Sequence, residues 1–346
     1  DKFTIIRSVD CRGSNHQPNQ VMQTGNLAAG PRVNKEGKMY PAIGSIVRKF
    51  HGPNHPELPA NVVLNLKDRT HFAWGGWLGK EFDPLVGDDA AKLFKISKGL
   101  SVDRLDNRKA LASKLESVRR HLDQDGDMSA FDQFGQQAFD LITGEKARKA
   151  FDLSLEPKKV IERYGDHPWA QKALMARRLV ESGVAYVTID LSNHSASGTW
   201  DTHGDKFPPY GGIVSGLKPL LPIFDHLFTT LLTDLDERGM LDDVLVIAMG
   251  EFGRNPQMGT QDSPDGRNHW PSVASMTIAG GGFRHGQVIG STSSDGGEIK
   301  ERPVTPGDLA ATIYHHFGIP LDSTYEDHRG RPRFILEHGQ PISEIV

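Results

Sequence analysis

The stretch from residue 242 to residue 270 reads DDVLVIAMGEFGRNPQMGTQDSPDGRNHW, and the rest of the expected fold is organised around it. Its first part, residues 244–249, is an unbroken apolar run of strand length, typical of a strand buried on both faces. Gly250 ends this run, and Glu251 follows at once. Segments just past the carboxyl ends of parallel strands line ligand-binding crevices, so we expect chemistry at this point.

Charged and polar side chains fill the remainder of this stretch. Arg254 lies three residues after Glu251, and the loop ends in Arg267 and His269 before a second apolar run at residues 273–279. An acid, two arginines and a histidine between two strands predict an anion site or a metal site. A solvated loop with incidental charges is the alternative, and the spacing alone does not separate the two.

A second polar segment, residues 198–205, follows a strand expected at residues 184–191 and reads GTWDTHGD. If this segment is extended, Asp201, His203 and Asp205 point to the same side, because side chains alternate along an extended chain. Carboxylate and imidazole groups at that spacing suit a divalent metal such as zinc. The alternative is a polar turn that is hydrogen-bonded to itself.

The chain opens with a strand expected at residues 3–9, and a short helix from about Gln20 to Gly25 follows a polar turn. Ser14 and Asn15 lie in that turn. A helix start offers free N–H groups and positive potential, which can hold an anion. The same two side chains are also suited simply to capping the helix.

The composition restricts the class of protein. The chain has 346 residues, of which 37% are hydrophobic and 24% charged, as is usual for globular proteins. The formal net charge is −4 and no long basic run occurs, which argues against nucleic acid or an anionic membrane surface as the main partner. Cys11 is the only cysteine, so the chain forms no internal disulfide. No apolar stretch reaches the roughly 20 residues of a membrane span.

Three motifs together resemble a known family. They are residues 200–205 (WDTHGD), 250–254 (GEFGR) and 266–270 (GRNHW), with weaker agreement at residues 147–151, 303–313 and 339–342. The chain resembles, over nearly its whole length, an uncharacterised sulfatase-like family of secreted bacterial proteins, often described only as a domain of unknown function. That family belongs to the alkaline phosphatase and sulfatase superfamily.

The resemblance implies an α/β fold of the alkaline phosphatase-like type, with a mostly parallel central sheet flanked by helices on both faces. It implies one domain over residues 1–346 that lacks the leading strand of the superfamily, and a periplasmic or extracellular location. By position within the motifs, the metal ligands correspond to Asp201, His203, Glu251 and His269. The implied cofactor is a divalent metal, either zinc or calcium.

The superfamily nucleophile is a Ser, Thr or modified Cys at a helix start before a Thr-Gly element. Counting back from that element puts Asn15 near this place, with Ser14 and His16 beside it, and an amide is not a nucleophile of that kind. The two arginines of the motifs would hold the anion. The candidate catalytic residues are therefore Ser14, Asn15, His16, Arg254 and Arg267.

Two functions from different classes follow. The first is a metal-dependent hydrolase of sulfate or phosphate esters, with a small anionic ester or a sulfated glycan as its partner. The second is a non-catalytic, sulfatase-like structural or binding protein in an extracytoplasmic assembly. A homo-oligomer is compatible with both. We expect the four metal candidates to converge in space, and the turn at residues 14–16 to lie at the same edge of the sheet as Glu251.

Overall fold

The computed structural model describes residues 1–13, 16–29, 40–66, 72–90, 144–192, 200–204, 211–260 and 263–346. Its largest sheet has four strands in the order β5-β8-β1-β9. These strands are β1 (Phe3–Val9), β5 (Leu245–Ala248), β8 (Ala274–Gly280) and β9 (Val288–Ile289). β8 runs antiparallel to both of its neighbours, whereas β1 and β9 are parallel.

This arrangement corrects the fold class. The resemblance predicts a mostly parallel central sheet flanked by helices on both faces, and that prediction is wrong: the sheet is mixed, and separate small sheets surround it. Parallel neighbours need a long crossover connection, usually a helix. The described part of the connection from β5 to β8 holds only loops and the antiparallel pair β6 (Gly253–Arg254) and β7 (His269–Trp270).

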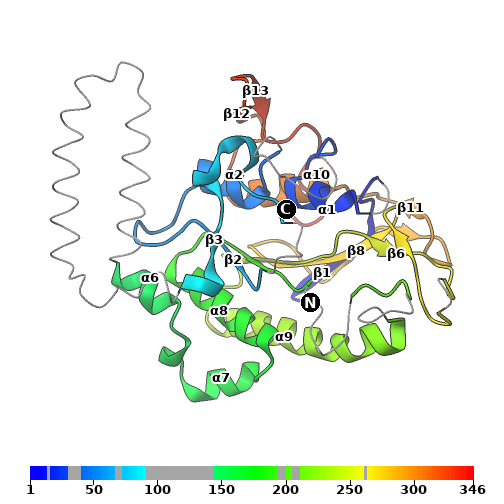
Figure 1. Ribbon diagram of the computed structural model, residues 1–346, viewed down its shortest axis with the longest axis horizontal. Helices are drawn as coiled ribbons and strands as arrows, with labels where there is room; N and C mark the ends of the chain where they lie inside the picture. Colours follow the sequence, from blue (N-terminus) through cyan, green and yellow to red (C-terminus); the bar gives the residue numbers. More distant parts are fainter. Residues whose placement is uncertain are drawn as a thin grey trace.

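The other strands form three smaller sheets. One is parallel and has the order β3-β2-β4, and the remaining two are antiparallel pairs. Figure 1 shows the pair β12 and β13 standing apart from the largest sheet. The strands are β2 (Asn61–Leu64), β3 (Leu85–Val86), β4 (Tyr186–Ile189), β10 (Ser291–Thr292), β11 (Ile299–Glu301), β12 (Thr324–Glu326) and β13 (Pro332–Phe334).

The start of the helix at residues 306–316 follows directly from its residue types. Thr305 accepts a hydrogen bond from the Asp308 N–H at 3.2 Å, and Asp308 accepts one from the Thr305 N–H at 2.8 Å, so this helix starts with a reciprocal cap. The α-helices are α1 (Pro18–Thr24), α2 (Ile43–Phe50), α6 (Glu145–Ala150), α7 (Lys158–Tyr164), α8 (Pro168–Ser182), α9 (Lys218–Glu237) and α10 (Pro306–His316). The short turns are η1 (Gly76–Leu78), η2 (Lys80–Phe82), η3 (Gly87–Asp89), η4 (Leu153–Leu155) and η5 (Ile213–Leu217).

β5 is the strand expected at residues 244–249, and it connects two parts of the core. Leu245 and Ile247 pack against a cluster that includes α2 and α10, whereas Val246 and Ala248 pack against α8 and α9. All four side chains are only partly buried, because β5 is an edge strand of its sheet. The packing fixes the point at which the chain leaves β5 towards Glu251.

Among the described residues, no helix combines the length and the apolar character that crossing a bilayer requires.

A buried ion network ties α8 to α9 and to the turn before α7. The Arg177 side chain is 0% exposed and lies 2.6 Å from Glu156 and 2.9 Å from Asp234. Burial by itself raises the pKa of each of these two carboxyls, but the hydrogen bonds and charges of neighbouring arginines, with Tyr164 at Asp234, hold the net pKa below its ordinary value. Both acids are therefore ionised at neutral pH and depend on this arginine.

Replacing Arg177 with methionine should lower the free energy of unfolding by about 3–5 kcal/mol, because two buried carboxylates each lose the fully buried partner of their ion network. The matched control is Arg163→Met: Arg163 of α7 pairs with Glu237 of α9 at the surface, and its loss should cost under about 1 kcal/mol. Urea denaturation measures both.

The effect of Arg177→Met should depend on pH. A depressed carboxyl pKa stabilises the folded state above the unfolded value of about 4, and that contribution is lost as pH falls through the folded pKa. The difference in unfolding free energy between wild type and variant should therefore be largest at pH 7 and become smaller below pH 4. A difference in unfolding free energy that increases on acidification would contradict this role of the network.

Candidate metal site beyond β4 and β5

The candidate ligands lie on segments that follow strands. Asp201 and His203 are in residues 200–204, beyond the carboxyl end of β4, and Glu251 is three residues beyond β5. His269 is the first residue of β7, and its pairing partner in β6 is Arg254. These segments are far apart in the sequence, so only the tertiary fold can bring their side chains together.

Three of the four predicted ligands converge. One donor atom each from Asp201, His203 and His269 lies within 4.8 Å of the others. Asp201 Oδ1 lies 2.5 Å from His203 Nδ1 and 3.5 Å from His269 Nε2. All three side chains are mostly buried, which shields the group from bulk water while leaving it accessible.

Main-chain contacts bring the two ligand segments together. The Arg267 N–H donates to the Thr202 carbonyl at 2.9 Å, and the Thr260 hydroxyl donates to the His203 carbonyl at 3.3 Å. The approach is so close that a Cβ at Gly204 would lie 2.3 Å from the Ser263 Cβ. Gly204 also has a φ of +85°, a conformation that favours glycine.

The variant Gly204→Ala should therefore weaken zinc binding as well as the fold. The control is Gly239→Ala: Gly239 has a φ of +67°, but no atom lies within 4 Å of a Cβ added there. Both should lose about 1–2 kcal/mol of unfolding free energy from the positive φ. Only Gly204→Ala should push the ligand segments apart, so zinc titration should separate the two variants. Equal zinc affinities would contradict this role for the glycine.

Trp200 anchors residues 200–204, which carry Asp201 and His203, to α8 and α9. Its ring stacks on Trp169 of α8 at 6.0 Å with an interplanar angle of 6°, and its Nε1–H donates to the Leu191 carbonyl at 2.8 Å. It also packs edge-on against Phe224 of α9. Asp201 therefore follows a residue held on three sides.

The electrostatics keep the central carboxylate charged. Burial raises the pKa of Asp201, but hydrogen bonds from His269 and His203 and the charge of Arg254 outweigh burial and hold that pKa well below its usual range. A metal ligand must be deprotonated to bind, so Asp201 is ready at any physiological pH.

The donor set fits zinc better than calcium. Two imidazoles and one carboxylate are a recurring set in catalytic zinc sites, whereas calcium takes oxygen ligands almost throughout. Ligands about 2.1 Å from a tetrahedral zinc lie roughly 3.4 Å apart. The 3.5 Å contact between Asp201 and His269 already has that length, and the 2.5 Å contact between Asp201 and His203 would open on binding.

Glu251 lies outside this three-residue group. Its Oε1 accepts a hydrogen bond from His16 Nδ1 at 2.8 Å, and its Oε2 is buried with no hydrogen-bond partner in the part of the chain that the structure describes. The His16 ring in turn lies 4.6 Å from the His269 ring. The geometry thus places Glu251 one side chain away from the metal ligands, with a carboxylate oxygen available.

The arginines of the motifs bind the main chain. Arg254 donates to the Trp200 carbonyl at 2.8 Å and the Arg267 carbonyl at 3.2 Å, and it approaches Asp201 Oδ1 at 3.3 Å. Arg267 donates to the Asn255 carbonyl at 2.6 Å and the Arg254 carbonyl at 3.0 Å. Their expected role as anion-binding groups stays a prediction.

The N-terminal expectation is met as far as the structure describes it. β1 lies inside its sheet between β8 and β9, and His16 reaches Glu251, so this end of the turn is at the predicted edge. Ser14 and Asn15 lie outside the described residues. α1 begins at Pro18, with Gln17 as the residue that precedes it.

Two neighbours of the site were not predicted from the sequence. Phe252 stacks on the His269 ring at 4.4 Å and also contacts His16, and Cys11 is fully buried nearby. Burial, with the charges of Asp10 and Glu251, raises the pKa of the Cys11 thiol to about 12, so it is an inert neutral group. Phe252 directly follows Glu251 in the GEFGR motif, and this position was the sequence signal that could have predicted its place beside the site.

Comparisons with known proteins place these features in a family. A family model described as "Protein of unknown function (DUF1501)" matches residues 1–346. The chain belongs to the DUF1501 family. A search of curated proteins gave no match.

Two solved structures are distantly similar to this DUF1501 chain. The crystal structure of Ps i-CgsB in complex with k-i-k-neocarrahexaose is 11% identical, with a TM-score of 0.45 over 92% of this chain and 65% of that one. The crystal structure of Ps i-CgsB has the same identity and coverage and a TM-score of 0.44. This chain thus spans less than two thirds of the length of those chains.

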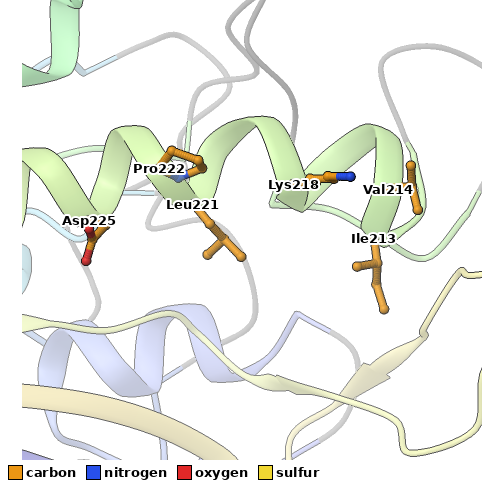
Figure 2. A pocket seen from close by; sticks show the side chains of 6 residues that line it. All are labelled: Ile213, Val214, Lys218, Leu221, Pro222 and Asp225. Carbon is orange, nitrogen blue, oxygen red and sulfur yellow. The ribbon is translucent and has the colours of Figure 1, made fainter.

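A pocket of about 500 Å³ lies at the start of α9 and is separate from the three ligands. Figure 2 shows Leu221 and Asp225 projecting from one side of this helix. The pocket is linked to the site through Asp265, whose carboxylate accepts from the Val214 N–H at 2.7 Å, four residues before His269. Its lining residues are Ile213, Val214, Lys218, Leu221, Pro222 and Asp225.

Proposed function

We propose that this DUF1501 protein is a zinc-dependent hydrolase of sulfate or phosphate esters. The observation that carries the proposal is the group formed by Asp201, His203 and His269, whose donor atoms lie within 4.8 Å of one another although they come from two distant segments. Catalytic zinc sites use three protein ligands of this kind and leave a position open for water or substrate.

The chain supplies the binding groups and a proton acceptor. Asp201, His203 and His269 would hold the metal, which when bound acts as a Lewis acid and lowers the pKa of water. Glu251 Oε2 is buried without a partner, and buried polar atoms are nearly always hydrogen-bonded in a working state. We assign this oxygen to the proton of the attacking water, with His16 holding the carboxylate in place through Oε1.

The step balances without a covalent enzyme intermediate. The water oxygen forms a bond to the sulfur or phosphorus while its proton passes to Glu251 Oε2, and the bond to the ester oxygen breaks. The departing alkoxide takes up a proton from solvent. This route needs no nucleophile at position 15, where the chain has an amide.

The substrate class follows from charge. A divalent ion next to the Arg254 guanidinium favours an anionic group, so a small anionic ester or a sulfated glycan suits the site. Membership of the alkaline phosphatase and sulfatase superfamily, a location in the periplasm or outside the cell, and one domain over residues 1–346 are further parts of the proposal. They are supported by the motifs at residues 200–205, 250–254 and 266–270.

Metal removal tests the function. The purified protein should cleave generic aryl sulfates or aryl phosphates when loaded with zinc, lose this activity on dialysis against a chelator, and regain it when zinc returns. Calcium should not restore it, because two of the three ligands are nitrogens. Protein that binds zinc at the three ligands but cleaves no ester in a broad panel would favour the non-catalytic binding role. Activity that persists in the presence of the chelator would exclude a metal-dependent hydrolase.

A further inference from the structure

One guanidinium spans the two segments that carry the metal ligands. Arg254 Nη2 donates to the carbonyl of Trp200 at 2.8 Å, and Trp200 directly precedes Asp201. Arg254 Nη1 donates to the carbonyl of Arg267 at 3.2 Å, two residues before His269. A single planar group therefore contacts the main chain beside two ligands that are 68 residues apart in the sequence (269 minus 201).

Arg267 makes the reciprocal contact. Its Nη2 donates to the Arg254 carbonyl at 3.0 Å and its Nε to the Asn255 carbonyl at 2.6 Å. Each arginine thus binds the main chain of the other across β6 and β7. We name these two residues the arginine pair.

The Arg254 guanidinium directs three of its five N–H donors at protein oxygens, which limits its capacity for a substrate. Arg254 Nη1 and Nη2 are both directed at carbonyls, and its contact with Asp201 Oδ1 is the longer one at 3.3 Å. The guanidinium also lies over the Phe252 ring, 5.5 Å from its centroid, which covers one of its faces. A group that grips a sulfate or phosphate would instead direct two parallel N–H bonds at the anion.

We infer that Arg254 and Arg267 are positioning residues that set the separation between Asp201 and His269, rather than groups that bind the substrate anion. The inference rests on the proposed function, since it concerns the geometry of the same metal ligands. A rigid fork with fixed donors can hold two carbonyls at once, whereas the single ammonium of lysine cannot reproduce that geometry.

Lysine substitutions separate geometry from charge. Arg254→Lys and Arg267→Lys keep the positive charge but lose the fork, and each should weaken zinc binding by about 10–100-fold, as the loss of outer-shell groups does. The absorption spectrum of bound cobalt, which reports ligand geometry, should change in both. The control is Arg284→Lys: Arg284 also donates to carbonyls, of Ser343 and Val346, but at the C-terminal tail, so zinc affinity and the cobalt spectrum should stay as in wild type.

The wild-type titration distinguishes failure of this inference from failure of the function. Wild-type protein that binds no zinc contradicts the proposed function. If wild type binds zinc and both lysine variants bind it equally well with an unchanged cobalt spectrum, the positioning role is overturned. A raised KM for the ester at unchanged zinc affinity would overturn it too, and would show that the arginines bind the anion.

A rescue experiment covers variants that lose stability. Thermal unfolding without metal shows whether Arg254→Ala is folded, and low millimolar guanidinium ion should then restore part of its zinc affinity by occupying the vacated site. The inference is contradicted if Arg254→Ala is folded, guanidinium does not restore its zinc affinity, and the two lysine variants bind zinc as wild type does.

Discussion

Replacing His269 with alanine is expected to reduce the affinity for zinc by more than about 100-fold, beyond the 10–100-fold effect typical of outer-shell substitutions. His269 supplies one of three donors, and its Nε2 lies at ligand-to-ligand distance from Asp201 Oδ1. Two remaining ligands cannot define the site, although Asp201 would keep its contacts with His203 and Arg254. Competition with a chromophoric chelator measures the change.

The control for this loss is an exposed histidine away from the site. His226 of α9 contacts the Tyr164 carbonyl at 3.1 Å, and within the described residues it forms no hydrogen bond with Asp201, His203 or His269. His226→Ala should bind zinc as wild type does. If His269→Ala kept wild-type affinity, the three-ligand site would be wrong.

Replacing Glu251 with glutamine should reduce ester hydrolysis by about 10²–10⁴-fold while zinc affinity changes by less than about tenfold. Glutamine has nearly the same shape and can still contact His16, but it cannot take a proton at the position of Oε2. Steady-state kinetics with an aryl ester and zinc titration measure the two effects separately.

The ratio of these two effects decides the role of Glu251. If Glu251→Gln loses zinc as completely as His269→Ala does, Glu251 is a metal ligand, as the family motif predicts. Glu237→Gln is the control, because Glu237 is an exposed acid of α9 that pairs with Arg163, and its hydrolysis rate should equal that of wild type.

Local features could be predicted from the sequence because their causes are local. Residues 3–9, rich in strand-forming residue types, form the expected strand, and Thr305 with Asp308 caps α10, as their residue types predict. The pairing of strands is different, since an apolar run such as residues 244–249 carries no record of which strand will lie beside it. The antiparallel placement of β8 therefore differs from the expected sheet.

The features of the site also fall into those that follow from local sequence and those that depend on the tertiary fold. Asp201 and His203 are two residues apart, so their proximity followed from chain geometry alone. The contact between His16 and Glu251 joins positions 235 residues apart and depends on the whole topology. Residue type also says little about which acceptor an arginine meets: Arg254 and Arg267 suit an anion in the sequence, yet in the structure they bind carbonyl oxygens.

The most direct test of the zinc site is a crystal structure of the zinc-loaded protein, with anomalous diffraction recorded on both sides of the zinc edge. We predict one strong zinc peak bounded by Asp201, His203 and His269, at ligand distances of about 2.0–2.2 Å. Zinc-loaded crystals in which those three side chains surround no anomalous peak would contradict the account.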